Sequence, residues 1–551
     1  MEKCEKEHGS IQGKELWKAD LGNGFYRNPI LYTDYSDPDV IRVGEDYYLI
    51  ASSFTYFPGV PVLHSKDLVN WEKINYCVRS LPFERYRRPA HGSGTWAPAL
   101  RYHDGIFYAF IPLPDEGIFV TTTKDPAGEW SGLRCIMEGK GFIDPCPFWD
   151  EDGRAYLAFA YANSRSGIHS RISICEMDHK AERILTAPVL VYDGTQTNPT
   201  IEGPKLYKRN GLYYIFAPAG GVEKGWQTVL RSGQIYGPYE ARVVLHQGNT
   251  EVNGPHQGAY VDAPDSSEWF LHFQDAGVFG RILHLQPLCW QDDWPFIGQE
   301  QNGDGIGEPV RTWRMPVISE EGRKYSVAAD DDFHSSDLSL AWQWQANPDP
   351  SWYSHTLRKG SLALYCAARP DQKESLLWYA PNACTQQLQA PEFDAYVALS
   401  LHGREEGDFA GAGILGYEYS YAGICRKKGK LCLIVRIGKV KNFDPLGRQD
   451  RQGTVEEETA AEFIPEIEEG NRIMLRLRVR NGVCSYAYLL GNGGYTELPG
   501  SFPLAKAVWT GAKFTLYACN LLNRASGGYG LYESVRFEPA ADDGRENSYD
   551  L

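Results

Sequence analysis

Three acidic residues, each close to a proline, stand at matching places in the first half of the sequence. Asp37, Asp144 and Glu202 lie in the segments SDPDV, IDPCPF and IEGPKL. If they share one site, their mutual repulsion raises the pKa of one carboxyl, so that one acid keeps its proton while another stays ionised. Glycosidic bond hydrolysis needs that division between a general acid and a general base. Asp-Pro and Glu-Gly-Pro also form turns, and for a single acid the turn would be the better interpretation.

Their register along a repeat favours the catalytic interpretation. Each acid precedes an aromatic residue of a strand-like run by 11 or 12 residues, and two further runs are preceded by Trp96 at 12 residues and by His256 at 14. The aromatic residues of the five runs are Tyr48, Tyr108, Tyr156, Tyr214 and Phe270. Equivalent positions in a repeat come together around its axis, so we expect the three acids to share one site.

The five runs predict the architecture that positions these residues. They read VGEDYYLIASS, YHDGIFYAFIP, DEDGRAYLAFA, YKRNGLYYIFAP and PDSSEWFLHFQD, and they recur about every 50 to 60 residues. Each is rich in aromatic or β-branched residues and begins at a turn, as strands of hairpins do. A repeat of this length fits the four-stranded blade of a β-propeller. We therefore predict an all-β chain that opens with a five-bladed β-propeller; a β-sandwich or a pair of β-sandwiches is the alternative.

The second half of the chain carries a different pattern. In RIMLRLRVRNG, Leu475, Leu477 and Val479 alternate with arginines, which predicts strands with one buried and one solvent-exposed face. The repeat is absent here and no helical stretch is evident, so we predict a β-sandwich of the jelly-roll kind. The expected domains are residues 1–320 and 330–541, with a boundary in the polar stretch 320–326.

Bulk properties exclude several classes of function. The net charge of −16 argues against nucleic acid, which requires a positive surface. No apolar run is long enough to span a membrane, and the first residues, MEKCEKEHGS, contain no apolar signal core. The 12 cysteines show no metal-binding spacing, and we expect reduced thiols in a cytoplasmic protein. Oligomers are compatible with the sequence.

Several longer segments resemble a known family. The stretch NPILYTDYSDPDVIRVGEDYYLIASSFTYFPGVPVLHSKDLVNW is similar to the first blade of glycoside hydrolase family 43. WAPAL, FIDPCPFWDEDGRAYL, IEGPKLYKRNGLYYIFAPAGG, NGPHQGAYVD and GRILHLQPLCWQDDWPFIG resemble its later blades. The likeness covers residues 25–300, and the region from DDFHSSDLSLAWQWQANPDP onward resembles the sandwich of many β-xylosidases in the family.

The resemblance implies an inverting mechanism and assigns roles. It implies that Asp37 is the general base, Asp144 the modulator of the acid's pKa, and Glu202 the general acid. It also implies substrate contacts from a further set of residues, namely Phe54, Trp96, Arg281 and His256. In many relatives the histidine ligates a calcium ion on the propeller axis. Calcium prefers oxygen, so water would have to supply most ligands, and a structural or electrostatic calcium ion here is as expected as none.

The resemblance to the family does not determine which terminal sugar the enzyme would release. The first interpretation is an exo-acting β-xylosidase acting on xylo-oligosaccharides. An α-L-arabinofuranosidase acting on arabino-oligosaccharides and a dual-activity enzyme are the alternatives, and an endo-arabinanase is disfavoured. EGPK, with Lys205, replaces the EGPH of many β-xylosidases, and IDPCPF replaces a DPS-type segment. A retaining fructosidase would carry WMNDPN where YSDPDV stands, and a non-catalytic sugar-binding propeller would lack one of the acids.

Overall fold

The computed structural model describes residues 15–316, 327, 329–444, 453–463, 465 and 467–540, and within these the chain is almost entirely β-structure. The predicted boundary at 320–326 lies outside the described residues. One α-helix is present among them, the single turn α1 (Asn163–Ser166). The short 3-10 helices are η1 (Glu84–Arg87), η2 (Gly277–Phe279), η3 (Pro350–Trp352), η4 (Gln372–Ser375) and η5 (Leu377–Tyr379).

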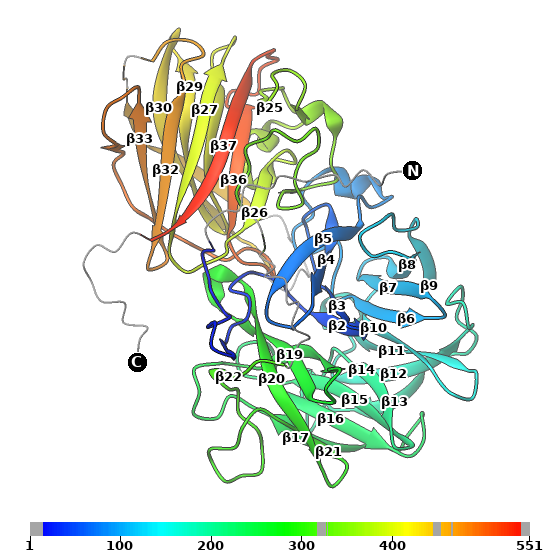
Figure 1. Ribbon diagram of the computed structural model, residues 1–551. Helices are drawn as coiled ribbons and strands as arrows, with labels where there is room; N and C mark the ends of the chain where they lie inside the picture. Colours follow the sequence, from blue (N-terminus) through cyan, green and yellow to red (C-terminus); the bar gives the residue numbers. More distant parts are fainter. Residues whose placement is uncertain are drawn as a thin grey trace, which may run out of the picture.

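Five consecutive antiparallel sheets of four strands form a β-propeller, so the predicted fold of the first half is confirmed (Figure 1). The first blade is β2 (Asp39–Val43), β3 (Asp46–Ile50), β4 (Gly59–Ser65) and β5 (Trp71–Val78). The second is β6 (Ala99–His103), β7 (Ile106–Leu113), β8 (Gly117–Thr123) and β9 (Arg134–Glu138). The third is β10 (Phe142–Trp149), β11 (Ala155–Tyr161), β12 (Arg171–Met177) and β13 (Val189–Asp193). The fourth is β14 (Lys205–Arg209), β15 (Leu212–Ala219), β16 (Trp226–Ser232) and β17 (Glu240–Leu245). The fifth is β18 (His256–Asp262), β19 (Glu268–Asp275), β20 (Arg281–Gln291) and β21 (Trp294–Ile297).

The aromatic runs that revealed the repeat are the second strands of the blades. Their aromatic residues lie in β3, β7, β11, β15 and β19, and all but Tyr48 are buried. Neighbouring blades pack through apolar side chains from these central strands. Phe107 and Ala109 of the second blade, for example, pack with Val62 of the first. Burial between blades, repeated around the ring, is what makes the repeat visible in the sequence.

The ring is closed by the segment that precedes the first blade. β1 (Phe25–Arg27) pairs with β22 (Thr312–Arg314), and Leu31 forms an antiparallel bridge with Leu283 of the last blade. The Tyr26 hydroxyl donates a hydrogen bond of 2.8 Å to the carbonyl oxygen of Leu285. The first and last blades are thereby held side by side.

The second half forms two stacked antiparallel sheets, which confirms the predicted β-sandwich. One sheet contains, in spatial order, β23 (Gln343–Trp344), β26 (Cys384–Gln387), β36 (Lys513–Asn520), β28 (Asp408–Leu415), β29 (Glu418–Lys427), β30 (Lys430–Lys441) and β31 (Thr454–Phe463). The other contains β24 (Tyr353–Ser354), β25 (Leu362–Tyr365), β37 (Tyr529–Pro539), β27 (Phe393–His402), β32 (Ile473–Arg480), β33 (Val483–Leu490) and β34 (Thr496–Glu497), with β35 (Phe502–Pro503) also paired to β33. In β32, buried and half-buried residues alternate along the strand, as the sequence predicted.

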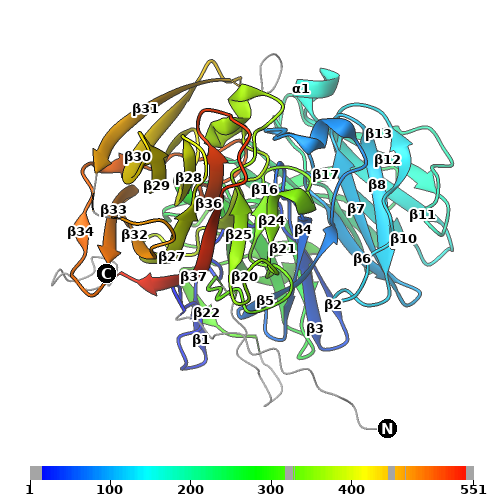
Figure 2. The ribbon, with the colours of Figure 1, turned by 90° about the horizontal axis from the view of Figure 1, so that it is seen from above.

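The sandwich lies against one side of the propeller (Figures 1 and 2). Backbone hydrogen bonds join the two, because Phe57 of the propeller and Trp344 of the sandwich exchange N–H···O bonds of 2.9 and 2.6 Å. The side chain of Asn347 likewise bonds both the N–H and the carbonyl of Leu81, each at 2.8 Å. Phe57 lies between β3 and β4 and Leu81 between β5 and β6, so these contacts fix the sandwich against the first blade and the connection to the second.

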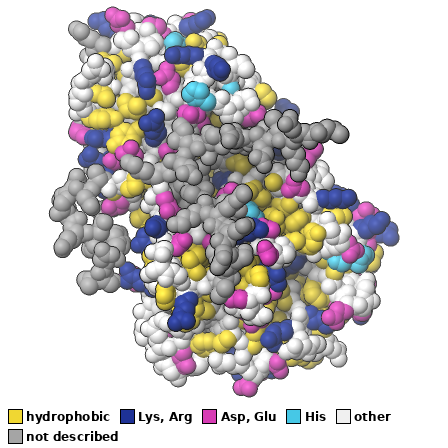
Figure 3. Space-filling view, viewed as in Figure 1, with side chains coloured by type: hydrophobic (Ala, Val, Ile, Leu, Met, Phe, Trp, Pro, Cys, Tyr) yellow, Lys and Arg dark blue, Asp and Glu magenta, His cyan; other side chains and the backbone are white. Residues whose placement is uncertain are grey.

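Three general features complete the description. The eleven described cysteines are free thiols. Within the described part of the chain, the search for a helix of the length and hydropathy needed to cross a membrane found none. On the face drawn in Figure 3, acidic and basic side chains are interspersed, without a broad field of one sign.

Candidate active site

The five equivalent positions lie where the innermost strand of each blade begins. Asp37 and Trp96 shortly precede β2 and β6, Asp144 lies near the start of β10, Glu202 precedes β14, and His256 is the first residue of β18. The pairing of β10 with β11 is irregular between Ile143 and Cys146, so Asp144 is released from the ladder. Because inner strands surround the propeller axis, this placement brings the five side chains to one end of that axis.

Asp37 is a buried carboxylate surrounded by donors. Its Oδ2 accepts hydrogen bonds from the Ser52 hydroxyl at 2.6 Å and the Ser36 hydroxyl at 3.0 Å. Its Oδ1 accepts a hydrogen bond from the Arg281 guanidinium at 3.0 Å. The backbone of Asp37 has a φ of +56°, in the left-handed region where aspartate is one of the better tolerated residues. This local conformation turns the carboxylate toward Arg281 of the last blade.

Asp144 is held by the turn that carries Glu202. The backbone N–H of Gly203 donates a hydrogen bond of 2.8 Å to Asp144 Oδ2. Gly203 has a φ of +60°, and a Cβ added there would lie 2.5 Å from the side chain of Gln257, so this position requires glycine. Burial, opposed by this hydrogen bond and reinforced by the charge of Asp37, raises the pKa of Asp144 to about 6.

Glu202 has the most strongly raised pKa of the three acids. Burial of its carboxyl and the nearby charges of Asp144 and Asp37 raise the pKa to about 8, while Arg281 opposes the rise. Its side chain is still 35% exposed, more than those of the other two acids, so a substrate could reach it. At neutral pH Glu202 therefore holds a proton that it can donate, next to a carboxylate that can accept one.

Arg281, at the start of β20, links the acids to an aromatic wall. Its guanidinium donates to the Ser36 hydroxyl at 2.5 Å and to Asp37, and its carbon Cζ lies 5.8 Å from the centre of the Phe54 ring. Phe54 has a φ of +49°, an unusual conformation for a bulky residue, and pairs with Thr95 through a backbone bridge. Such strain is found where a side chain is held in a fixed orientation for function.

Trp96 continues this wall into the second domain. Its ring lies edge-on to that of Phe54, with centroids 6.1 Å apart, and edge-on to that of Trp509, with centroids 6.3 Å apart. Trp509 belongs to a sandwich loop, and Val508 beside it packs so closely on Gly92 that a Cβ there would lie 2.8 Å from Val508 Cγ1. The sandwich therefore contributes an aromatic residue to the edge of the site. Sequence reasoning missed Trp509, because no repeat or motif marks this loop.

Asp34 anchors the same sandwich loop to the site. Its Oδ1 accepts the backbone N–H of Arg281 at 2.9 Å, and its Oδ2 accepts the backbone N–H of Gly511 at 2.9 Å. The Lys513 ammonium lies 3.4 Å from the same Oδ2, and both side chains are 3% exposed. One carboxylate thus joins Arg281 to the loop that carries Trp509. The sequence gives no signal for this role beyond the closeness of Asp34 to Asp37.

His256 lies beside the expected general acid. Its Nε2 is 3.6 Å from Glu202 Oε1, and neither ring nitrogen has a hydrogen-bond partner among the described residues. Burial, aided by the charge of Arg281, lowers the pKa of His256 to about 3, so the ring is neutral at physiological pH. A neutral, unpartnered imidazole is able to ligate a metal ion or a water bound to one.

Lys205, the residue that departs from the family pattern, is also buried. It opens β14 of the fourth blade, and its ammonium donates a hydrogen bond of 3.3 Å to the carbonyl oxygen of Pro98, just before β6 of the second blade. Its charge opposes the rise in the pKa of Asp144. Lys205 therefore acts on the acids electrostatically and helps to join two blades.

The seven residues singled out from the sequence all lie in this one region. Arg281 contacts Asp37 and Phe54, and Phe54 contacts Trp96. Glu202 lies beside His256 and interacts electrostatically with Asp144. Sequence reasoning did not select Ser36, Ser52 or Gln257. Two of these directly adjoin selected residues in the sequence, so adjacency was the available signal.

Comparison with known proteins identifies the family. Residues 26–295 match the model for glycosyl hydrolases family 43, and residues 330–538 match a concanavalin A-like domain described as the β-xylosidase C-terminal domain. A provisionally named β-xylosidase of Xylanibacter ruminicola is 42% identical over 415 residues, which cover 74% of each chain. A β-xylosidase of Formosa agariphila is 32% identical over 92% of this chain and 90% of its own.

A solved structure agrees with the fold. The xylan β-1,4-xylosidase of Bacillus halodurans superimposes with a TM-score of 0.80 over 93% of this chain and 99% of its own, at 23% identity. The sequence relatives and the two family models, together with the cluster of acids at the propeller axis, lead to one conclusion. The chain belongs to family 43 of the glycosyl hydrolases.

Proposed function

We propose that the protein is an inverting, exo-acting glycoside hydrolase that releases terminal β-D-xylose from xylo-oligosaccharides or related hemicellulose fragments. The observation that carries the proposal is the unequal environment of the acids. Glu202, with a pKa of about 8, keeps a proton at neutral pH, whereas Asp37 accepts three hydrogen bonds as a carboxylate. An acid and a base placed in one site are the minimum that glycoside hydrolysis requires.

In the proposed mechanism, Asp37 removes a proton from a water molecule, which attacks the anomeric carbon from the face opposite the leaving group. Glu202 gives its proton to the departing glycosidic oxygen, so that the leaving sugar departs as a neutral alcohol. The charge of Asp144 helps to raise the pKa of Glu202 and keeps that proton available. Arg281 holds Asp37 in place, and inversion follows because water attacks directly and no covalent intermediate forms.

The sandwich supports the assignment of exo action. Trp509 lies against Trp96 at the edge of the site, and the loop that carries it is tied down through Asp34. A fixed aromatic residue there limits how a long polymer could lie across the acids. Replacing Trp509 with alanine should therefore raise KM for xylobiose more than it lowers kcat, because an aromatic wall binds sugar in the ground and transition states alike.

The choice of xylose rests on similarity and has one close rival. The relative from Formosa agariphila is named a β-xylosidase, that from Xylanibacter ruminicola is provisionally named one, and the matched sandwich model carries the same name. An α-L-arabinofuranosidase or a dual-activity enzyme remains the alternative, since the two terminal sugars present similar hydroxyl groups near the scissile bond. Lys205 beside the acids is the feature of this chain that could shift the preference.

We also propose that a calcium ion could be held near His256, mainly by water. The unpartnered, neutral imidazole fits such an arrangement, but it supplies one nitrogen where calcium needs six to eight mostly oxygen ligands. A bound cation would supply positive charge near the acids. Cytoplasmic location and an oligomeric state stay predictions from the sequence.

The deciding experiment measures kcat/KM on nitrophenyl β-D-xylopyranoside and nitrophenyl α-L-arabinofuranoside, and follows by NMR which anomer of xylose forms first from xylobiose. A lead of tenfold or more for the xyloside, about 1.4 kcal/mol of transition-state discrimination, together with α-xylose as first product, supports the proposal. Comparable rates indicate dual activity, and β-xylose as first product excludes inversion. Binding of pentosides without turnover would instead favour a sugar-binding propeller.

A further inference from the structure

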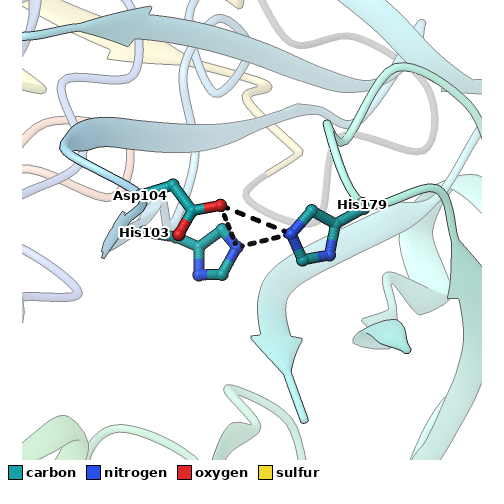
Figure 4. Close-up of side chains that lie close together, drawn as sticks. All are labelled: His103, Asp104 and His179. Carbon is teal, nitrogen blue, oxygen red and sulfur yellow. Dashed lines mark hydrogen bonds and ion pairs between the residues drawn. The ribbon is translucent and has the colours of Figure 1, made fainter. Parts of the chain in front are cut away.

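A second group of chemically able side chains lies between the second and third blades. His103 ends β6, Asp104 lies in the turn that leads to β7, and His179 follows β12 (Figure 4). The two imidazole Nε2 atoms are 3.0 Å apart, and Asp104 Oδ2 lies 3.4 Å from the first and 3.5 Å from the second. Three ligand atoms of types that bind metal thus point at one spot.

This group is separate from the candidate active site. Trp96 lies before the start of β6, whereas His103 is the last residue of that strand. A five-residue strand spans about 17 Å, so the two positions lie at opposite ends of the inner strand. His179 follows the end of β12 at Met177, on the same side of the blades as His103. In the described part of the chain, the hydrogen bonds and ion pairs of these three side chains join them to one another and not to the acids of the active site.

A neighbouring tryptophan contacts both histidines, one at its ring and the other at its backbone. The ring of His103 stacks on that of Trp149, with centroids 4.7 Å apart and planes 14° from parallel. The Trp149 indole N–H donates a hydrogen bond of 2.8 Å to the backbone oxygen of His179. One residue of β10 therefore positions both histidines, as supporting residues commonly do around metal ligands.

The spacing of the three atoms fits a tetrahedral ion. Zinc lies about 2.0–2.1 Å from histidine nitrogen and about 2.0–2.2 Å from carboxylate oxygen, which places neighbouring ligand atoms of a tetrahedron roughly 3.3 Å apart. The three observed separations bracket this value. We propose that His103, Asp104 and His179 bind a zinc ion, with water as the fourth ligand.

The surroundings suit this assignment. The side chain of His103 is 23% exposed, while those of Asp104 and His179 are 72% and 51% exposed, so water can reach the fourth position. Two imidazoles and one carboxylate match zinc better than calcium or magnesium, which prefer oxygen ligands alone.

The ion would act as a clamp between blades. His103 and Asp104 belong to the second blade and His179 to the third, so binding adds a metal link between two blades that also pack through apolar side chains. The expected consequence is a higher midpoint of thermal unfolding in the presence of zinc, because a ligand that binds the folded state stabilises it. Hydrolysis itself should not depend on the ion.

The test uses the full chain without an affinity tag, freed of metal with EDTA, and titrates it with zinc chloride in a calorimeter. We expect one tight site per chain, and a loss of at least about 100-fold in affinity in His179→Ala, which removes an exposed ligand. Asp104→Asn should weaken binding as well. The matched control is His334→Ala, since His334 forms a comparable pair with Asp332 that has no second imidazole, and its variant should bind zinc like the parent.

Cobalt provides a spectroscopic check of geometry. Co²⁺ in the parent protein should give the strong visible bands of a tetrahedral ion, and these should be absent in His179→Ala. Activity on nitrophenyl β-D-xylopyranoside, measured with calcium resupplied and zinc left out, should be the same in the EDTA-treated parent as in the zinc-loaded parent and in His179→Ala. The proposal is overturned if the parent binds no stoichiometric zinc, or if His179→Ala binds it with parental affinity.

Discussion

Charged side chains lie in different surroundings at the active-site end of the propeller axis and on the strands of the sandwich. At the propeller axis, Asp37 and Asp144 are nearly inaccessible, and the raised pKa values of Asp144 and Glu202 reflect the cost of burying them. In the sandwich, the pair formed by Lys441 of β30 and Glu456 of β31 is about half exposed on both sides. Burying the acids lowers the free energy of unfolding but adjusts their pKa values for catalysis. A half-exposed ion pair changes the free energy of unfolding very little.

The largest expected effect comes from removing the proposed base. Asp37→Asn should lower kcat/KM about 10⁴-fold on xylobiose and on nitrophenyl xyloside alike, because a better leaving group does not replace a base that activates water. Steady-state kinetics on both substrates measures this. Substantial activity on the nitrophenyl substrate would transfer the role of base to another residue.

Removing the proposed acid should give a smaller loss that depends on the substrate. In Glu202→Gln we expect a loss of about 10³-fold on xylobiose and much less on a dinitrophenyl xyloside, whose leaving group needs no protonation. Because Glu202 must be protonated to act and its pKa is about 8, kcat/KM of the parent should fall as pH rises through that value. This alkaline limb should disappear in the variant with the activated substrate, and its persistence would argue against the assignment.

The buried ion pair of Asp34 and Lys513 joins the propeller to the sandwich, and its loss should affect stability rather than chemistry. Asp34→Asn should destabilise the protein by about 3–5 kcal/mol, because it leaves the buried ammonium of Lys513 unpaired. Lys73, whose pKa burial and Lys513 lower to about 7, would then share the site with an uncompensated cation. The midpoint of urea denaturation reports the change. The double variant Asp34→Asn/Lys513→Met should recover part of the loss, and equal stability of all three proteins would contradict the reasoning.

The smallest effect is expected at the surface of the sandwich. Lys441→Ala removes one member of a half-exposed ion pair and should change stability by about 0.5 kcal/mol or less, with kcat/KM unaltered. Thermal unfolding and the nitrophenyl assay check both statements. A change as large as that at Asp34 would erase the distinction between the two regions.

The blade repeat and the acids could be found in the sequence because their signals are local. Each central strand repeats an aromatic run, and Asp37, Asp144 and Glu202 stand at a nearly fixed distance before it. The alternation of apolar and charged residues in β32 similarly predicted a sandwich strand with one buried face and one face toward solvent. These patterns follow from the geometry of strands and need no knowledge of distant contacts.

Other features were decided by tertiary structure. Trp509 reaches Trp96 across more than 400 residues of chain, Asp34 meets Lys513 in the same way, and His103 meets His179 across two blades. No local pattern encodes such meetings, because they depend on how blades close into a ring and where the sandwich docks. The sequence by itself thus determined the type of fold and the three acids. The family resemblance also indicated Phe54, Trp96, Arg281 and His256 around the acids. Only packing over long separations added Trp509 and Asp34 and buried the acids, and that burial produces the raised pKa values of Asp144 and Glu202.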